Sequence, residues 1–275
     1  MRVYISIDME GIAGIADRRQ VNRGTDDYEH SRTLMAGEAN AVIAGAFGAG
    51  AEVVVVNDSH GDLCNLRPAD IDDRAQLQIG SVRRPNGMTF GIEAGFDAAM
   101  FIGYHAMVGT ASAVLEHSFS SATVADLRVN GESWGETEFN AAIAGGVGVP
   151  VVLVSGDDAA CSQAVKTLPS VHTVAVKKGL GYRAMRSLSP AEARQALTAK
   201  AAEALRAPLP APFTPAPPFE LEIDFLTTSM TEYAAVVPGA RRPRPRTVAA
   251  TAADTEELNR YLASFLDLAV HGLGI

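Results

Sequence analysis

The chain has 275 residues, of which 47% are hydrophobic and 20% charged, with two cysteines and a formal net charge of −9. This composition excludes a disulfide-stapled mini-protein and wholesale disorder. The acidic balance argues against a nucleic-acid partner, because phosphate binding needs clustered Lys and Arg. Apolar stretches such as Val149–Val154 are far shorter than the roughly 18 residues of a membrane helix, and Asp8 and Glu10 interrupt the N-terminus before a signal peptide could form. We therefore expect a cytoplasmic protein without membrane contact, in which Cys64 and Cys161 are free thiols.

The first two thirds of the chain alternate between predicted strands and helices. Met35–Phe47 carries apolar residues at helical spacing. Short apolar or β-branched runs, typical of strands covered on both faces, occur at Val3–Ile7, Glu52–Asn57, Ala98–Tyr104, Val149–Ser155 and His172–Val176. Strands separated by helices of this length predict an α/β fold: a doubly wound, largely parallel sheet with helices on both faces.

A hairpin interrupts this alternation. Thr123–Val129 reads as a strand, and the Asn130-Gly131 pair that follows suits the positive φ angles of a type I′ turn. A helical pattern begins after the returning strand. Glu136 therefore stands at a junction between hairpin and helix, where a side chain can be aimed at a site.

Past about residue 180 the pattern changes, so we expect residues 1–180 to form the catalytic α/β domain and residues 181–275 a smaller α+β domain or an elaboration of the first. Ser189 to Glu192 forms a capping box that predicts a helix to about Arg206, and prolines are concentrated between Pro208 and Pro218. The remaining expected features are an alternating strand at Phe219–Phe225, a pairing partner at Thr247–Ala252, a helix capped by Asp254, and a solvated loop at Arg241–Arg246.

Potential metal ligands follow three successive predicted strands. Asp8 and Glu10 lie two residues apart after the first strand, His60 follows the second, and His105 follows the third. Ligands of open α/β sheets bind outside the carboxyl ends of the strands. Taken alone, each acidic residue could cap a turn and each histidine could serve as a structural hydrogen-bonding group. Their convergence at one edge predicts a metal site.

Carboxylate and imidazole donors together suit zinc, with manganese or cobalt as alternatives. Asp8, Glu10, His60 and His105 could hold one ion, and the addition of Glu136 makes two ions feasible. Two ions can share a hydroxide and polarise the bond that it attacks.

Five segments, taken together and in order, resemble the M55 peptidases, which are D-aminopeptidases. They are Ser6–Gly11, Asn57–His60, Gly103–His105, Glu116–Ser118 and Gly135–Glu136. The resemblance covers most of the chain and weakens in the proline-rich and C-terminal parts. It implies a dinuclear zinc aminopeptidase that removes N-terminal D-amino acids from short peptides and assembles as a homodecamer. It also implies that His117 is the catalytic residue and that the metal ligands are Asp8, Glu10, His60, His105 and Glu136.

Some assignments stay open at this point. His117 could transfer a proton or stabilise the transition state, and an exposed loop histidine is the alternative. Asp58 could bind the substrate α-amine or hydrogen-bond a ligating histidine. The alternatives to a peptidase are a dinuclear phosphoesterase or amidohydrolase and a non-catalytic small-molecule binding module. The lack of a Gly-rich phosphate loop disfavours the phosphoesterase.

Overall fold

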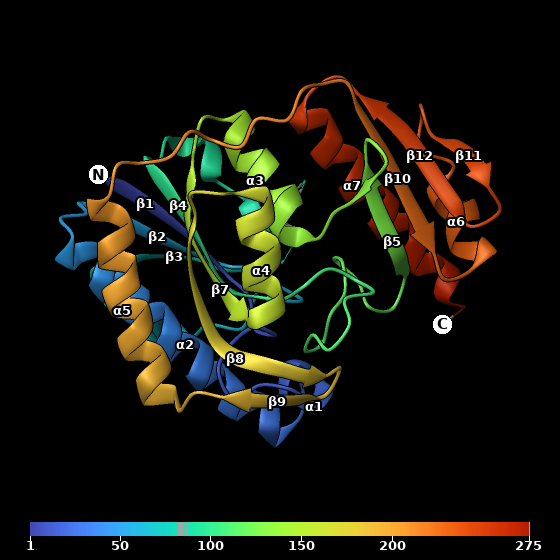
Figure 1. Cartoon of the computed structure of the whole chain (residues 1–275). Helices are drawn as coiled ribbons and strands as arrows, with labels where there is room; N and C mark the ends of the chain where they lie inside the picture. The colour runs from blue at the N-terminus through green and yellow to red at the C-terminus, as the bar shows by residue number, and fades with distance from the viewer. Residues whose placement is uncertain (82–84, 86, 275) are drawn as a thin grey trace.

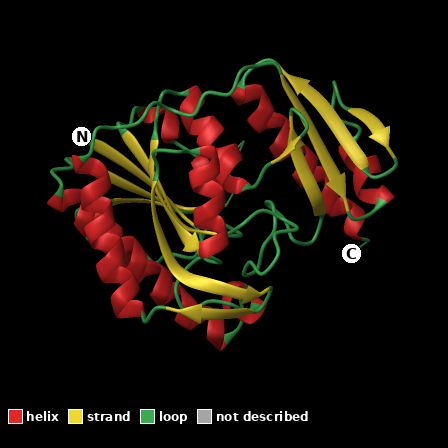
Figure 2. Cartoon of the chain, viewed as in Figure 1, coloured by secondary structure: helices red, strands yellow, loops and turns green. Residues whose placement is uncertain are grey.

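The computed structural model of the chain describes residues 1–81, 85 and 87–274 and contains two sheets with helices packed around them (Figures 1 and 2). The larger sheet is parallel except for its last strand, and its order from edge to edge is β3 (Gln76–Gln78), β2 (Val53–Asp58), β1 (Arg2–Ile7), β4 (Ala98–Tyr104), β7 (Val151–Asp157), β8 (His172–Gly181) and β9 (Ala184–Ser187). The strand order runs outward in both directions from β1 and β4. The doubly wound, largely parallel fold predicted from the sequence is confirmed.

Alternation along the strands explains why both faces of this sheet carry helices. In β1, Val3, Ile5 and Ile7 enter one apolar core, whereas Tyr4 enters another on the opposite face. The first core is closed by α1 (Arg18–Val21), α2 (Asp26–Gly48) and α5 (Pro190–Arg206), and the second by α3 (Glu136–Gly146) and α4 (Asp158–Thr167). Short 3₁₀ turns lie at Pro68–Asp70, Gly87–Thr89, Ile92–Ala94 and Val270–Leu273.

The smaller sheet is antiparallel, and its order is β11 (Arg241–Arg244), β12 (Thr247–Ala252), β10 (Phe219–Phe225), β5 (Val124–Val129) and β6 (Glu132–Ser133). One face packs against α6 (Thr228–Ala234) and α7 (Thr255–Ala269), which together with the sheet enclose a third apolar core. The predicted hairpin is present, since Asn130 and Gly131 have φ angles of 53° and 84°. The predicted pairing of Phe219–Phe225 with Thr247–Ala252 is confirmed as well.

The two sheets are not consecutive in the chain. β5 and β6 of the smaller sheet lie between β4 and β7 of the larger one, and α5 packs against α2 although it follows residue 180. A division at residue 180 stays a prediction. Helix α3 contributes to two cores, with Ala141 and Ala144 in the core under the parallel sheet and Phe139 and Ile143 in that of the antiparallel sheet.

One local expectation is wrong. The Arg241–Arg246 segment is not a loop throughout, because residues Arg241–Arg244 form the edge strand β11 paired with β12. Proline is compatible with this position, since its missing N–H faces away from the partner on an edge strand. The segment is exposed, as expected. Of the helices in the described part of the chain, none has the length and apolar character that crossing a bilayer requires.

Candidate metal centre

The continuation of β1 carries Asp8 and Glu10 along the end of β4. The Gly11 N–H donates to the Gly103 carbonyl at 2.7 Å. A Cβ atom on Gly11 would lie 2.1 Å from the Tyr104 carbonyl oxygen, so only glycine permits this approach. The close passage places both carboxylates beside the carboxyl end of β4, where they are buried at 3% and 6% exposure.

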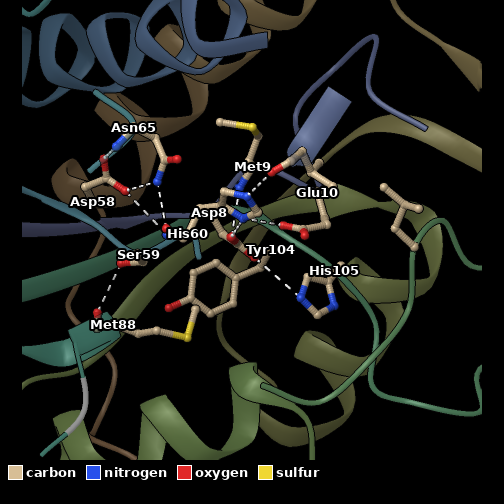
Figure 3. Close-up of polar contacts among 12 residues, drawn as sticks. Asp8, Met9, Glu10, Asp58, Ser59, His60, Asn65, Met88, Tyr104 and His105 are labelled. Atoms are coloured by element: carbon tan, nitrogen blue, oxygen red, sulfur yellow. Dashed lines mark hydrogen bonds and ion pairs between the residues drawn. The ribbon is translucent and has the colours of Figure 1, made fainter. Parts of the chain in front are cut away.

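The other predicted ligands reach the same place from neighbouring elements, and Figure 3 shows His60 and His105 beside Asp8 and Glu10. β2, β1 and β4 lie side by side in the sheet, so His60 after β2 and His105 after β4 flank the end of β1. Glu136 is the first residue of α3, at the predicted junction between hairpin and helix. His117 lies in the loop between β4 and β5. The structure thus brings together all the predicted ligands and the predicted catalytic residue.

Asp8, Glu10 and His60 form the first of two tight groups. The His60 Nδ1 atom lies 3.1 Å from Asp8 Oδ1 and 2.8 Å from Glu10 Oε2. One ligand atom from each residue lies within 4.8 Å of the others. This spacing suits three donors around one cation.

His105, His117 and Glu136 form the second group. The His105 Nε2 atom lies 3.3 Å from Glu136 Oε2, and the His117 Nε2 atom lies 3.8 Å from Glu136 Oε1. The two imidazole rings are stacked, with centroids 4.0 Å apart and planes 14° apart. By distance alone His117 could be a donor to a cation in this group.

Asp8 lies between the two groups. Its Oδ1 atom is 3.1 Å from His60 Nδ1, and its Oδ2 atom is 3.5 Å from His105 Nε2. Each oxygen of this carboxylate therefore faces a different histidine. A carboxylate in this position can bridge two cations, which is the arrangement that a dinuclear centre requires.

The backbone fixes how each histidine presents its ring. His60 Nε2 lies 2.8 Å from the Val21 carbonyl, and His105 Nδ1 lies 3.0 Å from the Ala106 carbonyl. His117 Nδ1 lies 2.8 Å from the Leu115 carbonyl. A carbonyl oxygen only accepts, so each of these ring nitrogens carries a proton. In the neutral tautomer the other nitrogen then presents a lone pair toward carboxylate oxygens.

Lone pairs that face one another in a buried site repel unless a cation or protons lie between them. Among the described residues, the buried atoms Glu10 Oε2 and His105 Nε2 make no hydrogen bond, although His60 Nδ1 and Glu136 Oε2 lie 2.8 and 3.3 Å from them. Backbone carbonyls that orient the rings from behind are also usual for histidines that bind metals. The donor set therefore fits a divalent metal such as zinc.

The raised pKa values of Asp8 and His105 also indicate that positive charge is favoured in this site. Burial and the neighbouring Glu10 carboxylate raise the pKa of Asp8 to about 7. Burial disfavours a charged His105, but Glu136 and the other carboxylates outweigh burial and raise its pKa to about 10. Burial and the neighbouring His105 lower the pKa of His117. His117 is therefore neutral at pH 7.

The structure does not bring Asp58 to the substrate side of this site. Its buried carboxylate accepts hydrogen bonds from the Asn65 N–H at 2.5 Å, the Asn65 side-chain amide at 2.8 Å and the Leu66 N–H at 2.7 Å. It lies 3.4 Å from the main-chain nitrogen of His60, so it contacts that residue through the backbone and not through the ring. Asp58 thus holds the loop after β2 in place (Figure 3).

Lys177, a residue of β8 that is only 3% exposed, was not predicted from the sequence. Its ammonium group donates to the carbonyls of Glu10, Ile12 (3.0 Å) and Ile15 (2.7 Å). The buried Glu38 carboxylate accepts a main-chain N–H of the same loop at 2.8 Å. Lys177 thus fixes the segment that carries Glu10. Alternation in β8 indicates that one of two adjacent lysines points inward, but it does not identify which.

A cavity of about 510 Å³ opens onto the two groups, which is within the usual range for a small-molecule site. Four of the candidate ligands line it, Asp8, Glu10, His60 and Glu136, and so does His117. The loops after α1 and β2 form part of its wall. Helix α7, which packs against the smaller sheet, contributes Leu262, Ala263, Leu266 and Asp267. Both sheets therefore shape the space in which a substrate would lie, a role for α7 that the sequence did not reveal.

Comparisons with known proteins agree with this geometry. The model of the M55 peptidase family, described as D-aminopeptidase, matches residues 1–264. A D-aminopeptidase of Bacillus subtilis (strain 168) is 40% identical over 240 residues, which cover 87% of this chain and 86% of that protein. The solved structure of the Zn-dependent D-aminopeptidase DppA from Bacillus subtilis, described as a self-compartmentalizing protease, is 37% identical, has a TM-score of 0.93 and covers 98% of both chains.

These matches extend along nearly the whole chain, including the proline-rich and C-terminal parts where the motif resemblance weakens. They favour a peptidase over the phosphoesterase and the non-catalytic module that sequence analysis left open. The chain belongs to the M55 peptidase family, the D-aminopeptidases, and is a peptidase hydrolase.

Proposed function

We propose that this protein is a zinc-dependent aminopeptidase that holds two ions and removes the N-terminal D-amino acid from short peptides. The observation that carries the proposal is the position of Asp8, whose two oxygens face histidines of two different groups. The first ion would be held by Asp8, Glu10 and His60. The second would be held by Asp8, His105 and Glu136. Zinc dependence of the DppA structure supports the choice of metal.

We assign His117 to the reaction and not to the metal. Its Nδ1–H donates to the Leu115 carbonyl, so Nε2 is the free lone pair of the neutral ring. His117 also lines the cavity, whereas His105 does not appear on the cavity wall. A neutral histidine at the cavity can accept a proton at Nε2 and later donate it to the departing amine.

When bound, the ions would supply Lewis acidity, which makes a nearby water more acidic and polarises a carbonyl. The residues of the chain supply position and proton transfer. His117 Nε2 takes the proton of the attacking water and returns it to the leaving nitrogen. Lys177 keeps the Glu10 segment in place beneath the substrate. Asp58 takes no part in amine binding, because its oxygens are occupied by the loop after β2.

The cavity wall gives the substrate side chain an apolar surface. Phe119 lines the cavity together with Leu262 and Leu266 of α7. Such a surface suits small apolar residues, because burial of apolar area is favourable without directional contacts. The preference for D-residues rests on the family and on the relatives.

Metal removal combined with a substrate panel tests the proposal. Dialysis against a chelator should abolish hydrolysis of D-alanyl-glycine, and zinc should restore it; manganese and cobalt test the alternative metals. Elemental analysis of the reconstituted protein should give two zinc ions per subunit. Full activity of the metal-free protein, a single ion per subunit, or faster hydrolysis of L-alanyl-glycine would contradict the corresponding part of the proposal.

We also propose that the protein assembles as a homo-oligomer, specifically a homodecamer. A self-compartmentalizing relative that covers 98% of the chain supports an assembly that encloses its active sites. Sedimentation equilibrium should give ten times the subunit mass, and a monomer would contradict the assembly.

We place the protein in the cytoplasm, where thiols stay reduced. Both cysteines, Cys64 and Cys161, are free in the structure, which matches a reducing compartment. Fractionation of the native host should recover the protein with cytoplasmic markers, and recovery outside the cell would contradict the assignment.

A further inference from the structure

A second, smaller cavity of about 60 Å³ adjoins the metal centre. This is about the space of two water molecules in the liquid, so it suits a small polar group. The residues that line both this cavity and the larger one are Glu10, Val21, Asn22, His117 and Ser121. The two openings therefore meet at the candidate ligands and at His117.

Arg18 lines only the smaller cavity and has a distinctive environment. Its neighbours Arg19 and Arg183 are both paired with the Asp17 carboxylate. Arg18 instead donates from Nη2 to the Tyr182 hydroxyl at 3.1 Å, and its Cζ atom lies 5.9 Å from the centre of that ring. Within the described part of the chain, Arg18 has no carboxylate partner within 4.0 Å. Its charge is oriented but not neutralised.

A series of hydrogen bonds links Arg18, which is an exposed residue, to the catalytic residue. Tyr182 stands in the turn between β8 and β9, and its carbonyl accepts the Leu115 N–H at 2.9 Å. The Leu115 carbonyl in turn accepts the Nδ1–H of His117 at 2.8 Å. The aromatic ring that holds the guanidinium and the imidazole that faces the substrate are thus connected through a single residue.

Charge differs between the two cavities. The larger one contains a single described cation, Arg23, and it is paired with Asp62 at 3.1 Å. The carboxylates that line the larger cavity are Asp8, Glu10, Asp62, Glu136 and Asp267. A short peptide carries a positive amine at one end and a negative carboxylate at the other. Glu10 also lines the smaller cavity, but Asp8, Glu10 and Glu136 are proposed metal ligands. With the ions bound, Arg18 remains as the cation of the smaller cavity, and it suits the carboxylate of the peptide.

We propose that Arg18, held by Tyr182, is a specificity-determining residue that binds the C-terminal carboxylate of short peptide substrates. A guanidinium can bind a carboxylate through two parallel hydrogen bonds. The inference rests on the proposed aminopeptidase function, and it assigns to this chain a binding site for an anionic peptide terminus.

The test compares two substrates that differ only in the terminal charge, D-alanyl-glycine and D-alanyl-glycine amide. The zinc-loaded wild-type protein should cleave the free acid with the higher kcat/KM. Arg18→Gln should lower kcat/KM for the free acid by about 10- to 100-fold, mainly through KM, and leave the amide within about twofold. Arg19→Gln is the matched control, because Arg19 is the adjacent arginine and lines neither cavity.

The substrate pair separates this inference from the proposed function. If the wild-type protein cleaves neither substrate, the aminopeptidase function fails. If it cleaves both equally well, or if Arg18→Gln lowers both alike, the carboxylate site is overturned while the function stands. Tyr182→Phe keeps the ring and removes the hydroxyl, so it should reduce the preference for the free acid by about threefold. An unchanged preference in both variants would also overturn the assignment.

Discussion

Two regions of the molecule gather acidic and basic side chains, and they balance the charge in opposite ways. On the outer face of the antiparallel sheet, Arg128 lies 2.9 Å from both Glu222 and Asp224, and Arg244 lies 2.8 Å from Glu222. At the carboxyl edge of the parallel sheet, the basic groups are imidazoles whose second nitrogens are turned toward carboxylates. The first region is partly exposed, and the second is buried.

The difference lies in where the compensating charge comes from. Arginine is always protonated, so the outer face is neutralised by the chain itself. At the carboxyl edge, backbone carbonyls take one N–H of each histidine, and the second nitrogen faces carboxylate oxygens, so a proton or a metal cation has to lie between them. That edge needs a cation from outside. Charge clusters of similar composition can therefore have a structural or a metal-binding role, depending on the identity of the base.

The strongest test of this comparison is Asp8→Asn. We expect loss of both metal ions and a fall in peptide hydrolysis of about a thousandfold or more, because several kcal/mol of transition-state stabilisation depend on the ions. Elemental analysis and dipeptide turnover measure the two effects. Asp224→Asn, in the arginine-neutralised region, is the control and should keep metal and activity. Retention of both ions by Asp8→Asn would remove the bridging role.

His117→Ala separates metal binding from proton transfer. We expect unchanged metal content and a fall in kcat of about 10²- to 10⁴-fold, the usual contribution of a general acid or base. His172→Ala is the control, since that histidine pairs with Glu203 at 3.5 Å away from the site. Metal loss in His117→Ala would show that His117 is a ligand, as its distance from Glu136 also permits.

Lys177→Met tests a buried cation that the chain itself supplies at the carboxyl edge. Its removal leaves buried carbonyls of the Glu10 segment without a donor, so the free energy of unfolding should fall by about 3 kcal/mol. Zinc should also bind more weakly because Glu10 is less well positioned. Urea denaturation and metal titration measure these changes. Lys178→Met, at the exposed neighbouring position, should change neither property, and equal effects of the two substitutions would contradict the role.

Arg128→Gln should have the smallest effect. Partly exposed ion pairs contribute about 0–1 kcal/mol, so stability should fall by no more than about 1 kcal/mol. Metal content and turnover should stay at wild-type values, because the outer face lies on the opposite side of the antiparallel sheet from its core. A loss of metal in this variant would mean that the two regions are coupled and that the comparison fails.

The sequence predicted the ligand-bearing strands well because local pattern and topology agree there. Continuous apolar runs identify strands buried on both faces, and side chains at the carboxyl ends of adjacent parallel strands must meet. Glu136 could be predicted for a different reason, since Asn130-Gly131 fixes the hairpin that ends just before α3. These features depend on residues close together in the chain.

The features that sequence analysis missed depend on contacts between distant segments. Lys177 meets the carbonyls after β1 across more than 160 residues, and α7 reaches the cavity from the end of the chain. The edge strand β11 forms by hydrogen bonding to β12. The role of Asp58 could not be predicted for a related reason. A carboxylate at the end of a strand has the same local sequence pattern whether it holds a loop in place or faces a substrate.

Helix α3 begins with Glu136 and then anchors itself in two cores, through Ala141 on one side and Phe139 on the other. Leu262, which packs in the same core as Phe139, also forms part of the cavity wall. The cavity wall at Leu262 and the helix that carries Glu136 therefore pack in the same apolar core. A substitution in this shared core would therefore be felt both at the cavity wall and at the helix that carries Glu136.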